Sequence, residues 1–237
     1  MPARAVGTGN EITRVEWLEH ALAQLPSGAR ILDAGAGEQP FKKFCGHLRY
    51  VSQDVAQYDG AGNRKGLQTG SWDFSGLDIV SDIASIPEPD ASFDAIMCTE
   101  VFEHIPDPLP AIKEFSRLLK PGALLLITAP FCSITHFAPH YFANGYSQYY
   151  YEKHLSDAGF DVVEIECNGN YFEYLAQELR RLPTVAAQYA HRSVSFFGKL
   201  AMRRVLTELQ ASTDANDGSE ELLCFGLHVR AIKTGDG

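Results

Sequence analysis

The sequence is short of several features, each of which would point to a particular class of protein. Its 237 residues contain no run of about 18 apolar residues, so it predicts no membrane-spanning helix. Its five cysteines form no Cys-x-x-Cys pair, which supports neither a disulfide framework nor a zinc knuckle. Basic residues number 20 against 30 acidic ones, and the net charge of −10 argues against a nucleic-acid partner.

The overall composition is that of an ordinary globular protein. Hydrophobic residues make up 45% of the chain and charged residues 21%, which argues against disorder. At this length we expect a single domain over residues 1–237, with room for an insertion. The N-terminal stretch is polar and lacks the apolar core of a signal peptide, so we expect a soluble cytoplasmic protein.

Short apolar segments alternate with segments of helical periodicity. Helices are expected at 11–25, 109–119 and 147–158, and strands at 29–32, 49–55, 77–80, 93–99, 123–129, 161–166 and 221–232. A long loop is expected at 57–76, and a helical insertion broken at Pro183 at 171–211. Strands that are apolar throughout and alternate with helices predict an α/β fold, with a parallel sheet covered on both faces.

The sharpest local motif is Ile-Leu-Asp-Ala-Gly-Ala-Gly at residues 31–37, where a strand enters a glycine-rich turn. Glycines permit a tight turn and a close approach of the backbone to a ligand. The third glycine of the dinucleotide fingerprint is missing, which disfavours a nicotinamide dehydrogenase. Asp33 stands before the first glycine, where a carboxylate suits a cationic group better than a pyrophosphate.

Acidic residues end successive predicted strands. Asp33, Asp54 and Asp82 follow the first three strands, and Glu100 follows the fourth. In open parallel sheets the ligand crevice lies beyond the carboxyl ends of the strands. Each acid alone is more typical of a turn or a helix cap. Three successive strand ends favour a nucleoside site, in which Asp54 accepts the ribose hydroxyls and Asp82 accepts from an adenine amino group.

Taken together, these motifs resemble the class I S-adenosylmethionine-dependent methyltransferases, in their small-molecule branch. The resemblance covers roughly residues 31–169, and 221–232 fits the closing strand. The matching segments are 31–37, Asp54, 82–83, 86–87, 92–96, 100–105 and 118–124. The resemblance implies a Rossmann-like sheet of seven mostly parallel strands with an antiparallel last strand, helices on both faces, and a helical insertion before the last strand.

The resemblance implies S-adenosylmethionine as the cofactor. It places the methionine part beside Asp33, Gly35 and Gly37, the ribose on Asp54, and the adenine on Asp82 and the Ile83 backbone. The full implied cofactor-binding set is Asp33, Gly35, Gly37, Asp54, Asp82, Ile83 and Thr99. The sequence departs from the family pattern after the glycine turn, at 38–41, and in its longer loop at 57–76.

Histidines and tyrosines follow the fourth and fifth predicted strands. A hydroxyl acceptor needs a base in addition to positioning. We rank His140 and His136 above His104 as that base, because the segment after the fifth strand usually meets the acceptor in this fold. Tyr141 and Tyr146 are candidate substrate-binding residues. For each of these residues, structural packing is the alternative. No metal-ligand spacing is present, so no metal is expected.

The expected acceptor is a hydroxyl of a small molecule or glycan, beneath a lid at about 130–151. Residues 136–141 resemble, more weakly, methyltransferases of surface-polysaccharide and glycan biosynthesis. N-methylation and methylation of a quinone-like phenol are alternatives, because the motif at 103–108 occurs broadly in such enzymes. A different class is a cofactor-binding regulatory subunit without activity, since Asp33, Asp54 and Asp82 argue only for binding.

The predicted insertion at 171–211 is basic within an acidic chain. It carries six basic and three acidic residues. Peripheral docking on an anionic membrane surface and a homodimer interface are two functional interpretations. The favoured interpretation is a helical cap packed on the sheet with a solvated basic face.

Overall fold

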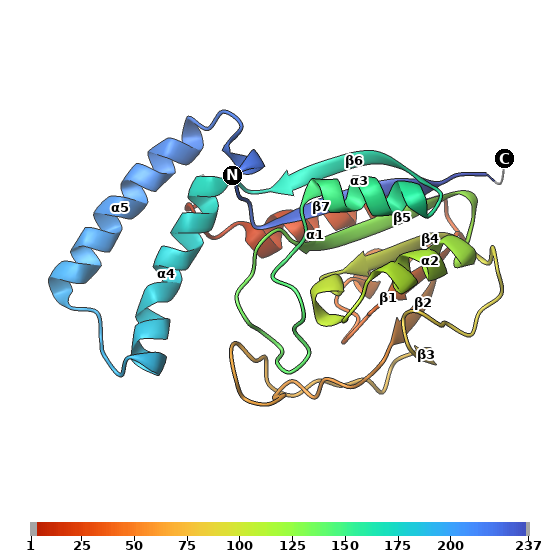
Figure 1. Cartoon of the computed structure of the whole chain (residues 1–237), viewed down its shortest axis with the longest axis horizontal. Coiled ribbons are helices and arrows are strands. Elements are labelled where there is room, and N and C mark those ends of the chain that lie inside the picture. Colours follow the sequence, from red (N-terminus) through yellow and green to blue (C-terminus); the bar gives the residue numbers. More distant parts are fainter. Residues whose placement is uncertain (1–3, 236–237) are drawn as a thin grey trace. The chain divides into compact units, whose positions relative to one another are not determined.

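The computed structural model describes residues 4–235, which divide into two compact units (Figure 1). Residues 15–166 and 227–235 form what we call the sheet unit. Residues 4–14 and 167–226 form the helical unit. The expected single domain, its lid at 130–151 and its insertion at 171–211 stay predictions.

A seven-stranded sheet in the order β3-β2-β1-β4-β5-β7-β6 dominates the fold. The strands are β1 Arg30–Ala34, β2 Arg49–Asp54, β3 Ile79–Val80, β4 Phe93–Thr99, β5 Leu119–Pro130, β6 Phe160–Asn168 and β7 Gly226–Lys233. The neighbouring pairs from β3 to β5 are all parallel. The predicted Rossmann-like α/β fold is confirmed.

The last strand runs antiparallel to β6. The Phe225 amide donates to the Asn168 carbonyl at 2.9 Å, next to the start of β7 and at the end of β6. The Thr234 amide donates to the Gly159 carbonyl at 2.9 Å, past the end of β7 and before the start of β6. The start of each strand therefore faces the end of the other, which confirms the expected antiparallel last strand.

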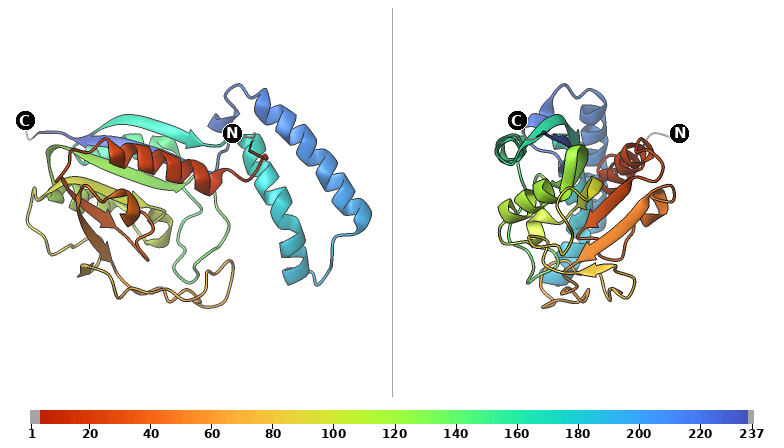
Figure 2. Two further views of the ribbon diagram at one scale, coloured as in Figure 1. Left: turned by 180° about the vertical axis from the view of Figure 1, so that it is seen from behind. Right: turned by 90° about the vertical axis from the view of Figure 1, so that its right-hand side faces the viewer.

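Helices cover both faces of the sheet (Figure 2). They are α1 Asn10–Ala23, α2 Leu109–Leu118 and α3 Gln148–Asp157. On one face Leu18 and Leu22 of α1 pack with Ile31 and Met97 of the strands. On the other face Phe115 of α2 and Tyr151 of α3 each stack on Phe102, with ring centroids 6.4 Å apart. The central strands β1 and β4 are therefore buried on both faces, whereas the edge strand β6 keeps exposed side chains.

The helical unit contains α4 Tyr171–Tyr189 and α5 Phe196–Asp214. Asn170 caps α4 by accepting from the amides of Phe172 and Glu173, both at 3.0 Å. Large apolar side chains stay exposed on α5, including Phe196 and Phe197. Among the helices of the described residues, none has the length and apolar character needed to cross a bilayer.

Two predicted boundaries are wrong. The expected helix break at Pro183 does not occur, because α4 runs through this proline to Tyr189 and the chain breaks only after Ala190. An internal proline costs a helix about 3 kcal/mol, and packing of α4 along α5 offsets that cost. The last strand begins at Gly226, not at Glu221, because residues Ser219–Glu221 form a short 3-10 turn.

Candidate functional site

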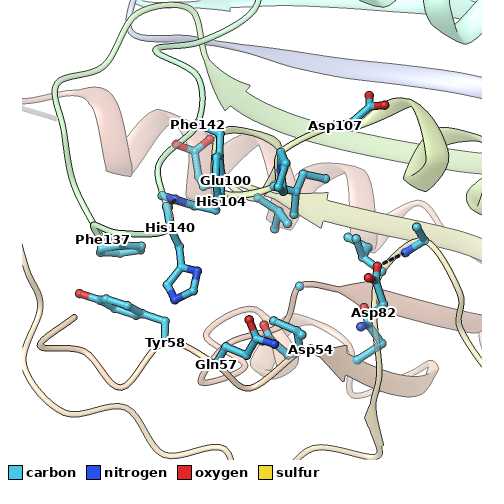
Figure 3. Close-up of a pocket in the computed structure, with 18 of the residues that line it drawn as sticks. Asp54, Gln57, Tyr58, Asp82, Glu100, His104, Asp107, Phe137, His140 and Phe142 are labelled. Carbon is cyan, nitrogen blue, oxygen red and sulfur yellow. Dashed lines mark hydrogen bonds between the residues drawn. The ribbon is translucent and has the colours of Figure 1, made fainter. Parts of the chain in front are cut away.

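A cavity of about 440 Å³ opens in the sheet unit beyond the carboxyl ends of β1, β2, β3 and β4 (Figure 3). This volume falls within the roughly 300–1,000 Å³ of small-molecule sites. The side chains around it come from strand ends, from the loop after β2 and from the segment after β5. The lining residues are Gly35, Gln53, Asp54, Val55, Gln57, Tyr58, Trp72, Asp82, Ile83, Ala84, Glu100, Val101, His104, Ile105, Pro106, Asp107, Pro110, Phe137, His140 and Phe142.

The charged side chains of the cavity are all acidic. Four carboxylates line it, from Asp54, Asp82, Glu100 and Asp107. Among the described lining residues there is no lysine or arginine. A cavity walled by one sign of charge attracts ligands of the opposite sign. The site therefore suits a cationic small molecule and repels a pyrophosphate.

Asp54 and Asp82 lie at the ends of β2 and β3, as predicted. Asp54 accepts from the Gly37 amide at 3.0 Å and, through its other oxygen, from the Ala56 amide at 2.8 Å. Asp82 accepts from the Ala84 amide at 2.8 Å, the bond dashed in Figure 3. A carboxylate has about four lone-pair sites, so both side chains are fixed by the backbone and keep acceptor capacity for a ligand.

The glycine turn is held by the neighbouring strand. The amides of Gly35 and Ala36 both donate to the Gln53 carbonyl, at 2.8 and 2.9 Å. A Cβ on Gly35 would lie 2.4 Å from the side chain of Val101, and φ at this residue is +79°. Gly35 lines the cavity and Gly37 does not. The turn therefore offers a ligand close approach, while its amides are already used to hold the turn.

Asp33 and Thr99 lie at strand ends without lining the cavity, and the side chain of Asp33 is buried. The Tyr50 hydroxyl donates to Asp33 at 2.5 Å. Burial raises the pKa of Asp33 to about 7, the Tyr50 bond opposes this, and the charge of Asp54 adds to it. The Thr99 hydroxyl oxygen is buried, and among residues 4–235 it has no hydrogen-bond partner. Of the predicted cofactor set, Gly35, Asp54, Asp82 and Ile83 line the cavity, whereas Asp33, Gly37 and Thr99 do not.

The three candidate histidines lie near one another but differ in access. His104, in the turn η2 Phe102–His104, and His140 line the cavity, and His136 does not. The ring of His104 hydrogen-bonds through Nδ1 to the His140 carbonyl at 2.6 Å. Burial lowers the pKa of His104 to about 4. Burial also acts to lower the pKa of His136, but Glu103 and the Ile134 carbonyl outweigh it and the pKa is raised.

The two candidate tyrosines are engaged elsewhere. The Tyr141 hydroxyl donates to the Ser133 carbonyl at 2.7 Å, and the Tyr146 hydroxyl to the Phe102 carbonyl at 2.9 Å. Neither tyrosine lines the cavity. In this structure both hold the segment after β5 in place.

An aromatic wall, formed by Tyr58, Trp72 and Phe137, closes the cavity on the side of the long loop. Tyr58 stacks on Phe137 with centroids 4.7 Å apart, and Trp72 meets both rings edge-on. Backbone hydrogen bonds join the loop to the segment after β5, from Leu67 to Thr135 at 3.0 Å and from Phe137 to Leu67 at 2.9 Å. The aromatic wall therefore excludes water and is positioned from two segments.

Part of the site could not be predicted from the sequence. The aromatic wall and the cavity-lining Gln53, Gln57, Asp107 and Phe142 were not predicted, nor was Glu103, which is fully buried beside His104. The one available signal for the wall was the presence of large aromatic side chains in a loop otherwise rich in small polar residues.

Known proteins resemble this chain in sequence and in fold. Residues 13–209 match the model of a family described as "Methyltransferase domain". A ubiquinone biosynthesis O-methyltransferase of Xanthomonas axonopodis pv. citri (strain 306) is 34% identical over 115 residues, which are 47% of this chain and 47% of that protein. The chain thus matches about half the length of such curated relatives.

Solved structures share the fold at low sequence identity. A phosphoethanolamine N-methyltransferase of Haemonchus contortus, crystallised with S-adenosylmethionine, has a TM-score of 0.54 at 16% identity, covering 94% of this chain and 53% of that chain. A [4+2]-cyclase has a TM-score of 0.55 at 20% identity, and the match covers 93% of this chain and 82% of the cyclase chain. The fold is shared, and proteins of different named activities use it.

Proposed function

Because this chain belongs to the family of methyltransferase domains, we propose that it transfers a methyl group from S-adenosylmethionine to a hydroxyl group of a small molecule. The observation that carries this proposal is the all-acidic cavity beyond the ends of β1–β4, with Asp54 and Asp82 at two adjacent strand ends. Such a lining suits a cationic nucleoside ligand. When bound, the cofactor supplies a methyl group activated by its positive sulfonium.

The residues of the cofactor side fit this ligand chemically. Asp54 keeps free lone pairs that would accept the ribose hydroxyls, and Asp82 would accept the adenine amino group beside the Ile83 backbone. Gly35 gives the ligand close access to the turn, and buried Asp33 adds negative charge behind it when ionised. Gly37 and Thr99 would act through the shape of the turn and of the β4 end.

The acceptor side must position a hydroxyl and exclude water. The aromatic wall provides the water exclusion, and a flat hydrophobic ring fits against it. His140 lines the cavity and is the first candidate to accept the hydroxyl proton, with His104 second. The curated relatives named ubiquinone biosynthesis O-methyltransferase support a phenolic hydroxyl as acceptor, with a glycan hydroxyl as the other class.

Labelled methyl transfer tests this function. The purified chain would be incubated with methyl-labelled S-adenosylmethionine and three acceptor panels: dihydroxylated phenols, polyols with nucleotide sugars, and primary amines. We expect label in the phenol panel. Label in the polyol panel alone would move the acceptor to the glycan class. Label only on amines would overturn the hydroxyl assignment, and label in none of the panels would support the regulatory-subunit alternative.

A further inference from the structure

Three potential ligand atoms converge beside the cavity. The Nε2 atom of His104 lies 3.6 Å from Oε1 of Glu103, and the Nε2 atom of His136 lies 3.8 Å from the same oxygen. All three ligand atoms lie within 4.8 Å of one another. Glu103 and His104 come from the turn after β4, and His136 comes from the segment after β5. The fold therefore brings the imidazole of His136, which is distant in the sequence, to the adjacent carboxylate and imidazole of Glu103 and His104.

The hydrogen bonds of the two histidines determine what their Nε2 atoms present. The Nδ1 atom of His104 lies 2.6 Å from the His140 carbonyl, and the Nδ1 atom of His136 lies 2.9 Å from the Ile134 carbonyl. A carbonyl oxygen only accepts, so each Nδ1 carries the hydrogen. In the neutral ring the Nε2 atom then presents a lone pair. This arrangement, with one nitrogen held by a carbonyl, is typical of metal-binding histidines.

Glu103 supplies the second, independent observation. Its side chain is fully buried, and within the described chain neither carboxylate oxygen has a hydrogen-bond partner. The separations of 3.6 and 3.8 Å to the two histidines exceed hydrogen-bond length. The buried carboxylate thus faces the Nε2 atoms of two histidines, and neither of its oxygens makes a hydrogen bond within the described chain. Buried acceptors without partners are unfavourable, and a cation placed between them removes the conflict.

From this geometry we propose that Glu103, His104 and His136 bind a divalent transition-metal ion of the zinc type. Two imidazoles and one carboxylate favour zinc or a similar ion over magnesium and calcium, which prefer oxygen ligands. Ligands that share an ion at about 2.0–2.2 Å lie roughly 3.0–3.6 Å apart, so small inward movements of the side chains close the site. No metal was predicted from the sequence, because the three ligands form no recognisable spacing.

Three protein ligands leave a coordination position open for a ligand from the cavity, which His104 lines. A hydroxyl oxygen that binds there loses its proton to water more easily, because the ion lowers its pKa. This role rests on the proposed function, whereas binding of the ion does not. In this role the bound ion would favour acceptors in which a second oxygen, next to the reacting hydroxyl, also binds the ion.

Metal binding to the whole chain tests the proposal directly. The chelator-treated protein would be dialysed against Zn²⁺ or Co²⁺, and bound metal measured by elemental mass spectrometry, with the visible absorption of Co²⁺ as a spectroscopic signature. We expect one ion per chain, and at least tenfold weaker binding in Glu103→Gln and in His136→Ala. The matched control is His20→Ala, which removes an exposed histidine of α1 and should bind as the wild type does.

Two results would overturn the proposal. One is no Zn²⁺ or Co²⁺ bound at millimolar concentration. The other is unchanged binding in both Glu103→Gln and His136→Ala, with thermal melts showing that both variants are folded. If Glu103 instead holds only a proton, the metal leaves the melting temperature of the wild type unchanged. Titration of the same samples with S-adenosylhomocysteine separates the two claims: binding of that ligand without metal binding overturns the metal site alone, and the reverse overturns the proposed function alone.

Discussion

The two sides of the cavity differ in how their polar groups are satisfied. On the cofactor side, Asp54 and Asp82 accept hydrogen bonds from nearby backbone amides, which fix them at the ends of β2 and β3. On the acceptor side, buried Glu103 lies 3.6 and 3.8 Å from the Nε2 atoms of His104 and His136, and its oxygens make no hydrogen bond within residues 4–235. The cofactor side is therefore preorganised by the chain itself, whereas the acceptor side is arranged to hold a further group. Four substitutions sharpen this comparison.

The largest effect is expected where the two sides meet, at Gly35. Gly35→Ala places a Cβ 2.4 Å from Val101, next to the turn that carries Glu103 and His104. Together with its left-handed φ of +79°, the clash should lower the free energy of unfolding by roughly 4 kcal/mol. Gly28→Ala is the matched control, because Gly28 has the same φ and no neighbour within 4 Å. Urea denaturation should show a clearly smaller loss for it. Equal losses would contradict close packing at Gly35.

The second effect is a pH dependence from Asp33. Burial raises its pKa from 3.8 to about 7, so between these values the folded state holds a proton that the unfolded state releases. Stability should therefore fall as pH rises from about 4 to about 7, by on the order of 3 kcal/mol in total. Asp33→Asn lacks this titrating group, so its stability should not fall in this way as the pH rises. Relative to the wild type, the variant should therefore be more stable at pH 8 than at pH 5. Denaturation curves at both pH values, with exposed Asp161→Asn as the control, measure it. A constant difference across pH would contradict the raised pKa.

Asp54 should dominate binding on the cofactor side. Asp54→Ala removes the acceptor of two ribose hydroxyls. Each lost charge-assisted hydrogen bond weakens the binding free energy by up to about 1.5–3 kcal/mol. We expect S-adenosylhomocysteine to bind at least tenfold more weakly, as measured by calorimetry. Asp161→Ala, on the exposed face of β6, should bind as the wild type does. Unchanged affinity in folded Asp54→Ala would remove Asp54 from the site.

The smallest effect is expected at Asp82. Asp82→Asn keeps one oxygen to accept from the Ala84 amide but presents a donor to the adenine amino group. Affinity for S-adenosylhomocysteine should fall by about 1 kcal/mol, less than in Asp54→Ala. Calorimetry under identical conditions ranks the two variants. A larger loss of affinity in Asp82→Asn than in Asp54→Ala would contradict the placement of the ribose at Asp54 and the adenine at Asp82.

The same contrast explains how much the sequence could predict. The strand ends that carry Asp54 and Asp82 follow from local hydrophobic runs and from the rule that ligands bind beyond the carboxyl ends of parallel strands. The acceptor side depends on non-local packing: the loop with Tyr58 and Trp72 pairs with the segment after β5, and His136 reaches Glu103 from that segment. No periodicity marks such contacts. The sequence also could not show which candidates would reach the cavity. His140 and His104 line it, whereas the Tyr146 hydroxyl donates to the Phe102 carbonyl.

Calorimetric titration of the wild-type chain with S-adenosylhomocysteine and, separately, with oxidised nicotinamide adenine dinucleotide tests the central claim most directly. The all-acidic lining and the strand-end carboxylates predict one site per chain for S-adenosylhomocysteine and no measurable heat with the dinucleotide, whose pyrophosphate is repelled. Equal binding of both ligands, or binding of the dinucleotide alone, would contradict the assignment of this cavity to S-adenosylmethionine.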